Sequence, residues 1–167
     1  VHKRNMRIIF DGVFNHIGVK SFAFSDVEKN QQASPYKDWF IVESWNDAAK
    51  GTKFKYKGWF GVRTLPEFKE DSTGIVAGPK EYIFNATKRW MNPMNKGIGN
   101  GIDGWRLDVA YNVGHPFWKD WGKWVRSINP EAYITAELVS PIEETRPYLN
   151  GDEFDATMGK TAAAAKP

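Results

Sequence analysis

An α/β fold built on a parallel sheet is predicted by three features of the sequence. Short runs of β-branched and aromatic residues alternate with segments whose apolar residues recur at helical spacing. Asn-Pro pairs and Gly-rich turns separate the two kinds of segment. Asp108 and Glu137, at the ends of two successive predicted strands, lie 29 positions apart, about the length of one βαβ unit. Strands that alternate with helices in this way form parallel units with right-handed crossovers.

The predicted elements follow one another as strand, inserted segment, helix, strand, helix, strand, helix, strand. The first strand covers residues 6–10, a β-branched and aromatic run typical of a buried parallel strand. The later elements are a helix over 79–92, a strand over 103–110, a helix over 115–128, a strand over 132–139, a helix from Pro141 towards Leu149 and a strand over 154–158. Pro79 suits the first turn of its helix, and Asn92-Pro93 and Asn129-Pro130 end two of the helices.

Residues 17–78 show no lasting periodicity and are rich in Gly, Pro, Asn and aromatic residues, including Trp59 and Phe60. A structureless loop of this length is improbable inside a compact domain. We therefore expect this segment to form a small unit with packing of its own.

The composition is that of a globular chain and excludes several classes of function. Net charge is only +3, and the Lys and Arg residues are scattered, which argues against a nucleic-acid-binding surface. No apolar run approaches the roughly 20 residues that span a bilayer, so we expect no membrane segment. The absence of cysteine excludes disulfides and thiolate metal sites, and the compartment stays open. The eight Trp residues favour a large core, with stacking on sugar rings as the alternative.

Polar side chains end each of the first three predicted strands, where a core strand has no need of them. They are Asp11, Asn15 and His16 on the first strand, Arg106 and Asp108 on the second, and Glu137 on the third. In parallel α/β architectures the carboxyl ends of the strands form the site. Arg106 and Asp108 share one side of their strand, and a guanidinium beside a carboxylate keeps it ionised, as a nucleophile requires.

Glu137 follows Ala136 and precedes Leu138 and Val139, so we expect an apolar setting that keeps it protonated as a general acid. Two carboxyl groups in opposed environments on adjacent strands are the arrangement that glycoside hydrolysis uses. The alternative is that Arg106 and Asp108 form a structural ion pair and that Glu137 caps the next helix. A retaining pair of carboxyl groups would lie about 5–5.5 Å apart.

Three segments resemble motifs of the α-amylase family, glycoside hydrolase family 13. Residues 10–16 (Phe-Asp-Gly-Val-Phe-Asn-His) resemble its first motif, residues 104–110 (Gly-Trp-Arg-Leu-Asp-Val-Ala) its second and residues 134–138 (Ile-Thr-Ala-Glu-Leu) its third. Leu65-Pro66-Glu67-Phe68 is similar to the short motif of its inserted domain. The neopullulanase and cyclomaltodextrinase branch is the most similar in these motifs.

The resemblance implies part of a TIM (β/α)8 barrel, about strands three to six, with a small inserted domain after the third strand. The barrel would comprise residues 1–16 and 78–167, and the inserted domain residues 17–77. The function implied is a retaining glycosidase acting on α-glucans such as maltooligosaccharides, cyclodextrins, pullulan or starch, through a covalent glycosyl-enzyme. A homodimer of the parent protein is a further possibility.

By matching position, Asp108 is the nucleophile, Glu137 the acid/base and Arg106 the residue that orients the nucleophile. His16 would bond the sugar, and Asp11 would support the geometry of the site. Asn15 stands where many relatives hold calcium, the one cofactor implied; the alternative is that Asn15 only bonds backbone at the strand end. The family's third carboxylate, on its seventh strand, lies outside this chain.

Both ends look cut, and residues 159–167 do not resemble the family's continuation. We therefore expect the 167 residues alone to aggregate and to be inactive. Alternative functions are a transglycosylase or branching enzyme of the same family, or a non-catalytic glucan-binding relative. A metal hydrolase built on His16 and His115 is disfavoured, because neither histidine belongs to a ligand-spaced pair.

Overall fold

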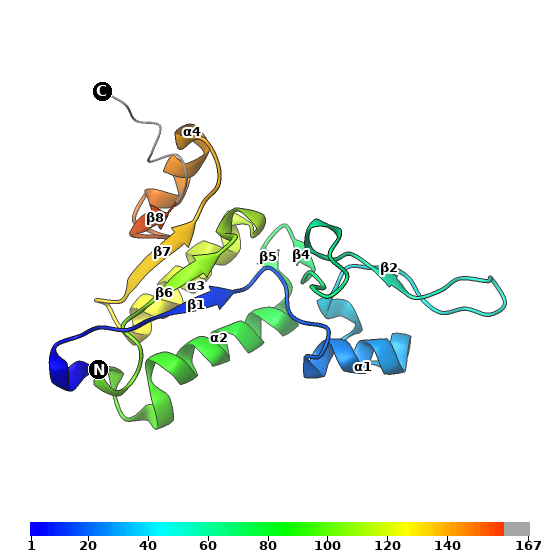
Figure 1. Cartoon of the computed structure of the whole chain (residues 1–167), viewed down its shortest axis with the longest axis horizontal. Coiled ribbons are helices and arrows are strands. Elements are labelled where there is room, and N and C mark those ends of the chain that lie inside the picture. The colour runs from blue at the N-terminus through cyan, green and yellow to red at the C-terminus, as the bar shows by residue number, and fades with distance from the viewer. Residues whose placement is uncertain (159–167) are drawn as a thin grey trace.

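The computed structural model describes residues 1–158, which contain a four-stranded parallel sheet with two long helices packed on one face (Figure 1). The strands lie in the order β1 (Ile9–Val13), β6 (Gly104–Asp108), β7 (Tyr133–Glu137) and β8 (Ala156–Met158). All neighbours pair in parallel. The sheet therefore has the predicted α/β topology, with each crossover carrying helical segments.

Helix α2 (Ala77–Met91) precedes β6, and helix α3 (His115–Ile128) joins β6 to β7. Between β7 and β8 the chain makes a single α-helical turn, α4 (Ile142–Thr145), and continues as a 3-10 helix. The 3-10 helices of the described chain are His2–Arg4, Gln31–Ala33, Lys37–Trp39, Trp59–Gly61, Pro93–Asn95, Ile98–Asn100, Ala110–Asn112 and Arg146–Leu149.

The two faces of the sheet differ in composition because side chains alternate along each strand. On β6, Trp105 and Leu107 are buried against the helices, whereas Arg106 and Asp108 point to the opposite face. The helix side holds a core of large aromatic rings, and Trp121 of α3 donates a 2.9 Å hydrogen bond from Nε1 to Thr87 Oγ1 of α2. The open face of the sheet thus carries the polar residues, and the opposite face packs against the helices.

The segment between β1 and α2 contains a helix that the sequence analysis did not predict. Helix α1 (Phe22–Asn30) begins after Ser21, whose Oγ accepts a 3.3 Å hydrogen bond from Phe24 N–H. Phe24 and Val27, three positions apart, are fully buried. Two hairpins follow: β2 (Val42–Ser44) with β3 (Lys55–Tyr56), and β4 (Glu70–Asp71) with β5 (Gly74–Ile75). The segment thus has packing of its own, as expected.

The β4–β5 hairpin attaches this segment to helix α3. Gly74 has a φ of +101°, and a Cβ there would lie 2.7 Å from Phe117 Cβ, so only glycine fits without a shift. Close approach lets Glu70 accept a 3.2 Å hydrogen bond from Gly114 N–H at the start of α3. Burial raises the pKa of Glu70, although this hydrogen bond opposes the effect. The inserted segment therefore contacts α3, the helix whose buried aromatic residues pack in the core under the sheet.

Several predicted boundaries were wrong for local reasons. The first strand begins at Ile9 rather than Met6, because the preceding residues form a 3-10 turn that ends at Asn5 in the left-handed region (φ 54°). Strand β6 ends at Asp108, because Val109 turns the chain with a φ of 42°. Helix α2 starts at Ala77, inside the range predicted for the inserted domain, so the division at residues 17 and 77 stays a prediction. The expectation for residues 159–167 lies outside the described residues.

Candidate active site

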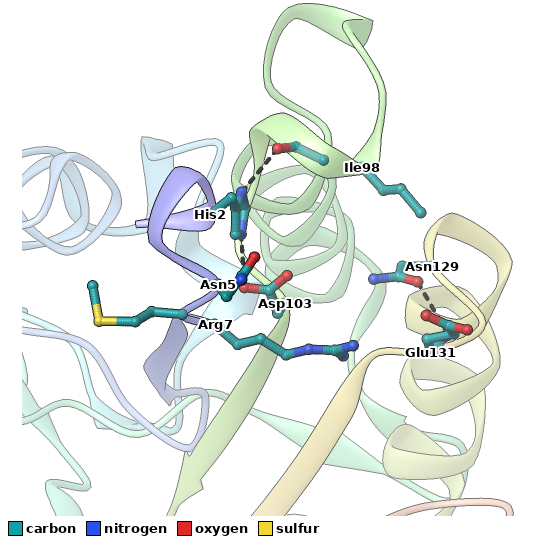
Figure 2. Close-up of a pocket in the computed structure, with 9 residues that line it drawn as sticks. His2, Asn5, Arg7, Ile98, Asp103, Asn129 and Glu131 are labelled. Atoms are coloured by element: carbon teal, nitrogen blue, oxygen red, sulfur yellow. Dashed lines mark hydrogen bonds and ion pairs between the residues drawn. The ribbon is translucent and has the colours of Figure 1, made fainter.

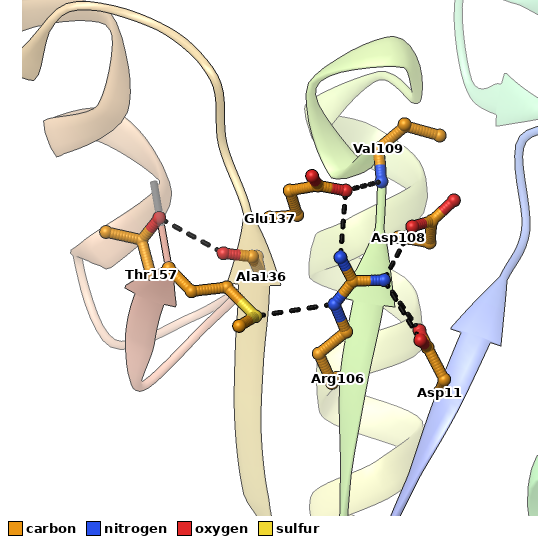
Figure 3. Close-up of polar contacts among 8 residues, drawn as sticks. Asp11, Arg106, Asp108, Val109, Ala136, Glu137 and Thr157 are labelled. Carbon is orange, nitrogen blue, oxygen red and sulfur yellow. Dashed lines mark hydrogen bonds and ion pairs between the residues drawn. The ribbon is translucent and has the colours of Figure 1, made fainter. Parts of the chain in front are cut away.

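Carboxylates from three adjacent strands meet one guanidinium at the carboxyl edge of the sheet (Figure 3). The strand register places Asp11 of β1 beside Arg106 of β6, and Val13 beside Asp108. Arg106 Nη1 donates to Asp11 Oδ1 at 2.8 Å and to Asp108 Oδ1 at 2.5 Å, and Nη2 lies 2.9 Å from Glu137 Oε2. Four of the six predicted site residues are therefore in one cluster of direct contacts.

The degree of burial separates the three carboxylates. Exposed fractions are 61% for the Asp11 side chain, 27% for Asp108 and 30% for Glu137. The outermost carboxylate is screened by water, so its pair with Arg106 contributes less than the two inner pairs. Burial works against the charge of Arg106, but the hydrogen bonds to Asp11 and Asp108 raise its pKa further above its already high value. Arg106 is consequently a permanent cation between two partly buried acids.

Glu137 has a polar environment that the sequence analysis did not predict. Ala136 and Leu138, the two sequence neighbours of Glu137, are buried. The Glu137 carboxyl group points the other way, to the open face of the sheet (Figure 3). Besides Arg106 Nη2, Glu137 Oε2 accepts a 3.2 Å hydrogen bond from Val109 N–H. The expectation of an apolar setting for this carboxyl group was therefore wrong. Neighbours in sequence did not reveal it, because adjacent residues on a strand point to opposite faces.

Val109 itself is in a costly conformation. A β-branched residue with positive φ is uncommon, and the strain is of order 1–3 kcal/mol. The left-handed turn directs Val109 N–H at Glu137 and starts the 3-10 helix Ala110–Asn112. The turn thus links the strand that carries Asp108 to the acid on the next strand. No feature of the sequence alone indicated it.

His16 lies beyond the end of β1 and is 7% exposed. On either side of it, backbone hydrogen bonds from Ile17 N–H to Pro66 O and from Phe68 N–H to Asn15 O join the end of β1 to the inserted segment. Its ring stacks on Trp59 with centroids 5.0 Å apart and planes at 22°. Asn15 Nδ2 lies 3.3 Å from His16 Nδ1 and can only donate, so the ring proton belongs on Nε2. Burial lowers the pKa of His16, while the charges of Asp108 and Glu67 act in the opposite direction. The imidazole is thus favoured in its neutral form.

Asn15 is 6% exposed and serves local structure in the described contacts. Its side chain orients His16, and its backbone carbonyl accepts a 3.0 Å hydrogen bond from Phe68 N–H. Within residues 1–158, no three His, Asp or Glu side chains converge as metal ligands. Asp47 and Asp71 each accept hydrogen bonds within their own turns. The donors present around Asn15 do not make a carboxylate cage, and calcium binding there stays a prediction.

His115 lies apart from His16 and has a different partner. At the start of α3, its Nδ1 is 2.8 Å from Oε1 of Glu153, a carboxylate with no exposed surface. Its ring contacts Tyr148 at a centroid distance of 4.0 Å. Burial raises the pKa of Glu153, against the effect of His115. The described chain does not bring the two histidines together as the disfavoured metal-hydrolase interpretation required.

A comparison of the chain with known protein families identifies its family. Residues 1–161 match the family described as "Alpha amylase, catalytic domain". The chain belongs to the α-amylase family. Its sheet is accordingly part of a TIM barrel, as the sequence motifs predicted.

Similar proteins of known name or structure agree with this assignment. The chain is 37% identical to neopullulanase 2 of Thermoactinomyces vulgaris, over 94% of its length and 24% of the relative's. It is 36% identical to a Bacillus cyclomaltodextrinase, over 94% and 26% of the two chains. The chain therefore spans about a quarter of the curated relatives it matches.

Among solved structures, a Nostoc punctiforme debranching enzyme superposes with a TM-score of 0.77 at 38% identity, over 94% of this chain and 30% of the other. A cyclic α-maltosyl-(1→6)-maltose hydrolase from Arthrobacter globiformis gives 0.77 at 34% identity, over 97% and 33%. Within residues 1–158, no helix combines the length and the apolar character that crossing a membrane requires.

Proposed function

We propose that the parent protein, to which this chain contributes part of the catalytic barrel, is a retaining glycosidase of α-glucans, with Asp108 as nucleophile and Glu137 as acid/base. The observation that carries the proposal is the shared guanidinium: Arg106 binds Asp108 through Nη1 and Glu137 through Nη2. Both carboxyl groups therefore flank one cation at the carboxyl edge of the sheet. The retaining course of the reaction is proposed from the family resemblance, because retaining enzymes use such a carboxyl pair without a water between the two groups, whereas inverting enzymes need room for one.

The proposed reaction has two steps. Asp108 attacks the anomeric carbon, the glycosidic C–O bond breaks, and Glu137 donates its proton to the departing oxygen. Water then replaces the enzyme at the same carbon while Glu137 takes a proton from it, and Asp108 is released as a carboxylate. Arg106 fits both steps. It keeps Asp108 ionised before attack and offers a contact to Glu137 when that group is ionised.

The remaining site residues take supporting roles in this proposal. His16, neutral and with its proton on Nε2, can donate a hydrogen bond to a sugar hydroxyl. Asp11 shares Arg106 Nη1 with Asp108 and so fixes the guanidinium from the β1 side. The α-glucan substrate is proposed from the family and from relatives named as neopullulanase and cyclomaltodextrinase.

The stereochemistry of the first-formed product tests the proposal. We expect proton NMR of a maltooligosaccharide or cyclodextrin digest made by the parent protein to show the α-anomer first, followed by slow mutarotation. Asp108→Asn, which keeps the shape of the side chain but not its charge, serves as the control and should form no product. Initial release of the β-anomer would mean inversion and would overturn the assignment of Asp108 as nucleophile.

A further inference from the structure

Three residues from separate segments form a chain of contacts beside the proposed site. Asn112 ends the 3-10 helix that follows β6, Trp59 lies in the inserted segment, and His16 follows β1. Trp59 Nε1 donates a 3.0 Å hydrogen bond to Asn112 Oδ1. The Trp59 ring in turn stacks on His16, with centroids 5.0 Å apart and planes at 22°. The contacts connect the segment just after Asp108 to the imidazole near it.

The hydrogen bond to Asn112 is the polar contact that fixes the rotation of the indole. The Trp59 backbone is held by a 2.9 Å bond from its N–H to Leu65 O, which leaves the side-chain torsions free. Its other ring neighbour, Phe60, is 74% exposed and offers little packing on the outer side. An indole N–H has one donor and no acceptor, so a single partner determines which way the ring edge points.

The position of Asn112 is itself tied to the catalytic strand. The 3-10 helix begins directly after Val109, and Asn112 N–H donates a 2.9 Å hydrogen bond to Val109 O. Val109 N–H contacts Glu137, so the same short turn contacts the acid on one side and the Trp59 ring on the other. A displacement of this turn would therefore reach both groups.

We propose that Asn112 is a positioning residue for His16 and acts through Trp59, which covers one face of the imidazole. Asn15 orients the ring edge through Nδ1, and Trp59 limits the tilt of the ring plane. With both contacts in place, Nε2–H of His16 has one direction in which to donate. The proposal rests on the proposed function, in which His16 bonds the sugar. Asn112 touches no reacting atom in this account.

The stacked indole also gives a readout that a purely structural contact would not change. The Trp59 ring lies over the imidazole with centroids 5.0 Å apart, so its ring current acts on the ring protons of His16. Loss of the indole, or a changed tilt of its plane, should therefore move the NMR signals of these protons.

A double-mutant cycle tests the link between the two residues. Asn112→Ala removes the acceptor, and Trp59→Phe removes the N–H but keeps a ring; each should lower kcat about tenfold with little change in KM. If the two residues act through this hydrogen bond, kcat of the double variant should be no lower than that of the less active single variant. Asn85→Ala, an exposed asparagine on α2, is the matched control and should leave both constants unchanged.

NMR of His16 makes the result independent of activity. The ring-proton signals of His16, assigned with His16→Gln, should move in Asn112→Ala and Trp59→Ala and stay in place in Asn85→Ala. Multiplicative effects in the cycle, or unchanged His16 signals in Asn112→Ala, would overturn the inference. A parent protein that cleaves no α-glucan would overturn the proposed function instead, while the His16 signals would still decide whether Asn112 and Trp59 position His16.

Discussion

Two aspartates mark the ends of strand β6, Asp108 as its last residue and Asp103 just before its first, and they have different surroundings. Asp108, at the carboxyl end, shares a guanidinium with Asp11 and Glu137 on the open face of the sheet (Figure 3). Asp103, just before the amino end, lies in a pocket with His2, Arg7 and Glu131 (Figure 2). Asp108 thus belongs to the cluster of acids at the proposed active site, whereas Asp103 accepts a hydrogen bond from the backbone.

Asp103 is occupied by structural contacts. Its Oδ2 accepts a 2.7 Å hydrogen bond from Ile8 N–H and lies 2.8 Å from His2 Nε2. Partial burial works against its charge, but these two hydrogen bonds prevail and lower the pKa of Asp103. The contacts tie the N-terminal residues to the start of β6. Asp108, by contrast, accepts a hydrogen bond from the side chain of Arg106, and its carboxylate faces the open side of the sheet (Figure 3). In barrels, function concentrates at the carboxyl edge and stability at the other.

The largest effect predicted by this comparison is the loss of turnover when Asp108→Asn is made in the parent protein. The amide cannot form a glycosyl-enzyme, so kcat should fall on the order of 10⁴-fold or more, while binding of the glucan changes little. Steady-state kinetics and calorimetric binding of a maltooligosaccharide would measure the two effects. Asp103→Asn, the matched change at the other end of the strand, should keep kcat within about twofold, since the Asp103 carboxylate contacts Ile8 and His2 and none of the proposed site residues. Equal losses in both variants would remove the distinction.

Glu137→Gln should give the next largest effect. The amide keeps an oxygen for Val109 N–H but has no proton to donate, so turnover should fall about 10²–10⁴-fold. A substrate with a good leaving group, such as an α-glucosyl fluoride, needs no acid in the first step. The first step on this substrate should therefore survive in Glu137→Gln. If the fluoride and the natural glucan suffer equally, Glu137 is not the acid.

A smaller effect is predicted for the stability of the amino edge. Asp103→Asn should lower the free energy of unfolding by about 1 kcal/mol at neutral pH, because a charged acceptor is lost from a partly solvated site. The folded pKa of Asp103 lies below its ordinary value of 3.8, so its stabilisation is complete above that value and is lost as the pH falls through the folded pKa. Urea unfolding at pH 7 and pH 3 should show the difference shrinking at low pH. A difference that grows on acidification would contradict the contacts assigned to Asp103.

Chelation is expected to have the smallest effect. Asn15 contacts His16 through Nδ2 and Phe68 N–H through its backbone carbonyl, and Asp47 and Asp71 accept hydrogen bonds within their own turns. We therefore expect the thermal midpoint of unfolding to be the same with a calcium chelator as without it. A lower midpoint that calcium restores would establish the calcium site that the family resemblance implies, with ligands in addition to those described.

Much of this arrangement could be predicted from the sequence, because it depends on the spacing of apolar residues and on the order of strands and helices along the chain. Alternating apolar runs predicted the parallel strands, and the polar ends of those strands predicted which residues would meet. Asp11, Arg106, Asp108 and Glu137 do meet. Helix α1 was missed because a nine-residue helix with only three buried positions has a weak pattern among so many aromatic residues.

The setting of Glu137 and the contacts of Trp59 could not be predicted in the same way. Glu137 lies next to Val109, which is distant in sequence and aims its N–H only because of a left-handed turn. Trp59 and Asn112 are 53 positions apart, and neither belongs to a periodic element. Contacts of this kind depend on how the inserted segment packs against the end of the sheet. Local sequence patterns do not predict such packing.

The most direct test of the account is to trap the covalent intermediate. An α-glucosyl fluoride with fluorine at C2 slows both steps, and in Glu137→Gln the second step is slowed further because no base activates water. After reaction, digestion and mass spectrometry, we predict a glycosyl adduct on the peptide that contains Asp108, and none in Asp108→Asn. In the wild-type protein treated in the same way, an adduct on Glu137, or inverted product with no adduct on either carboxylate, would contradict the account.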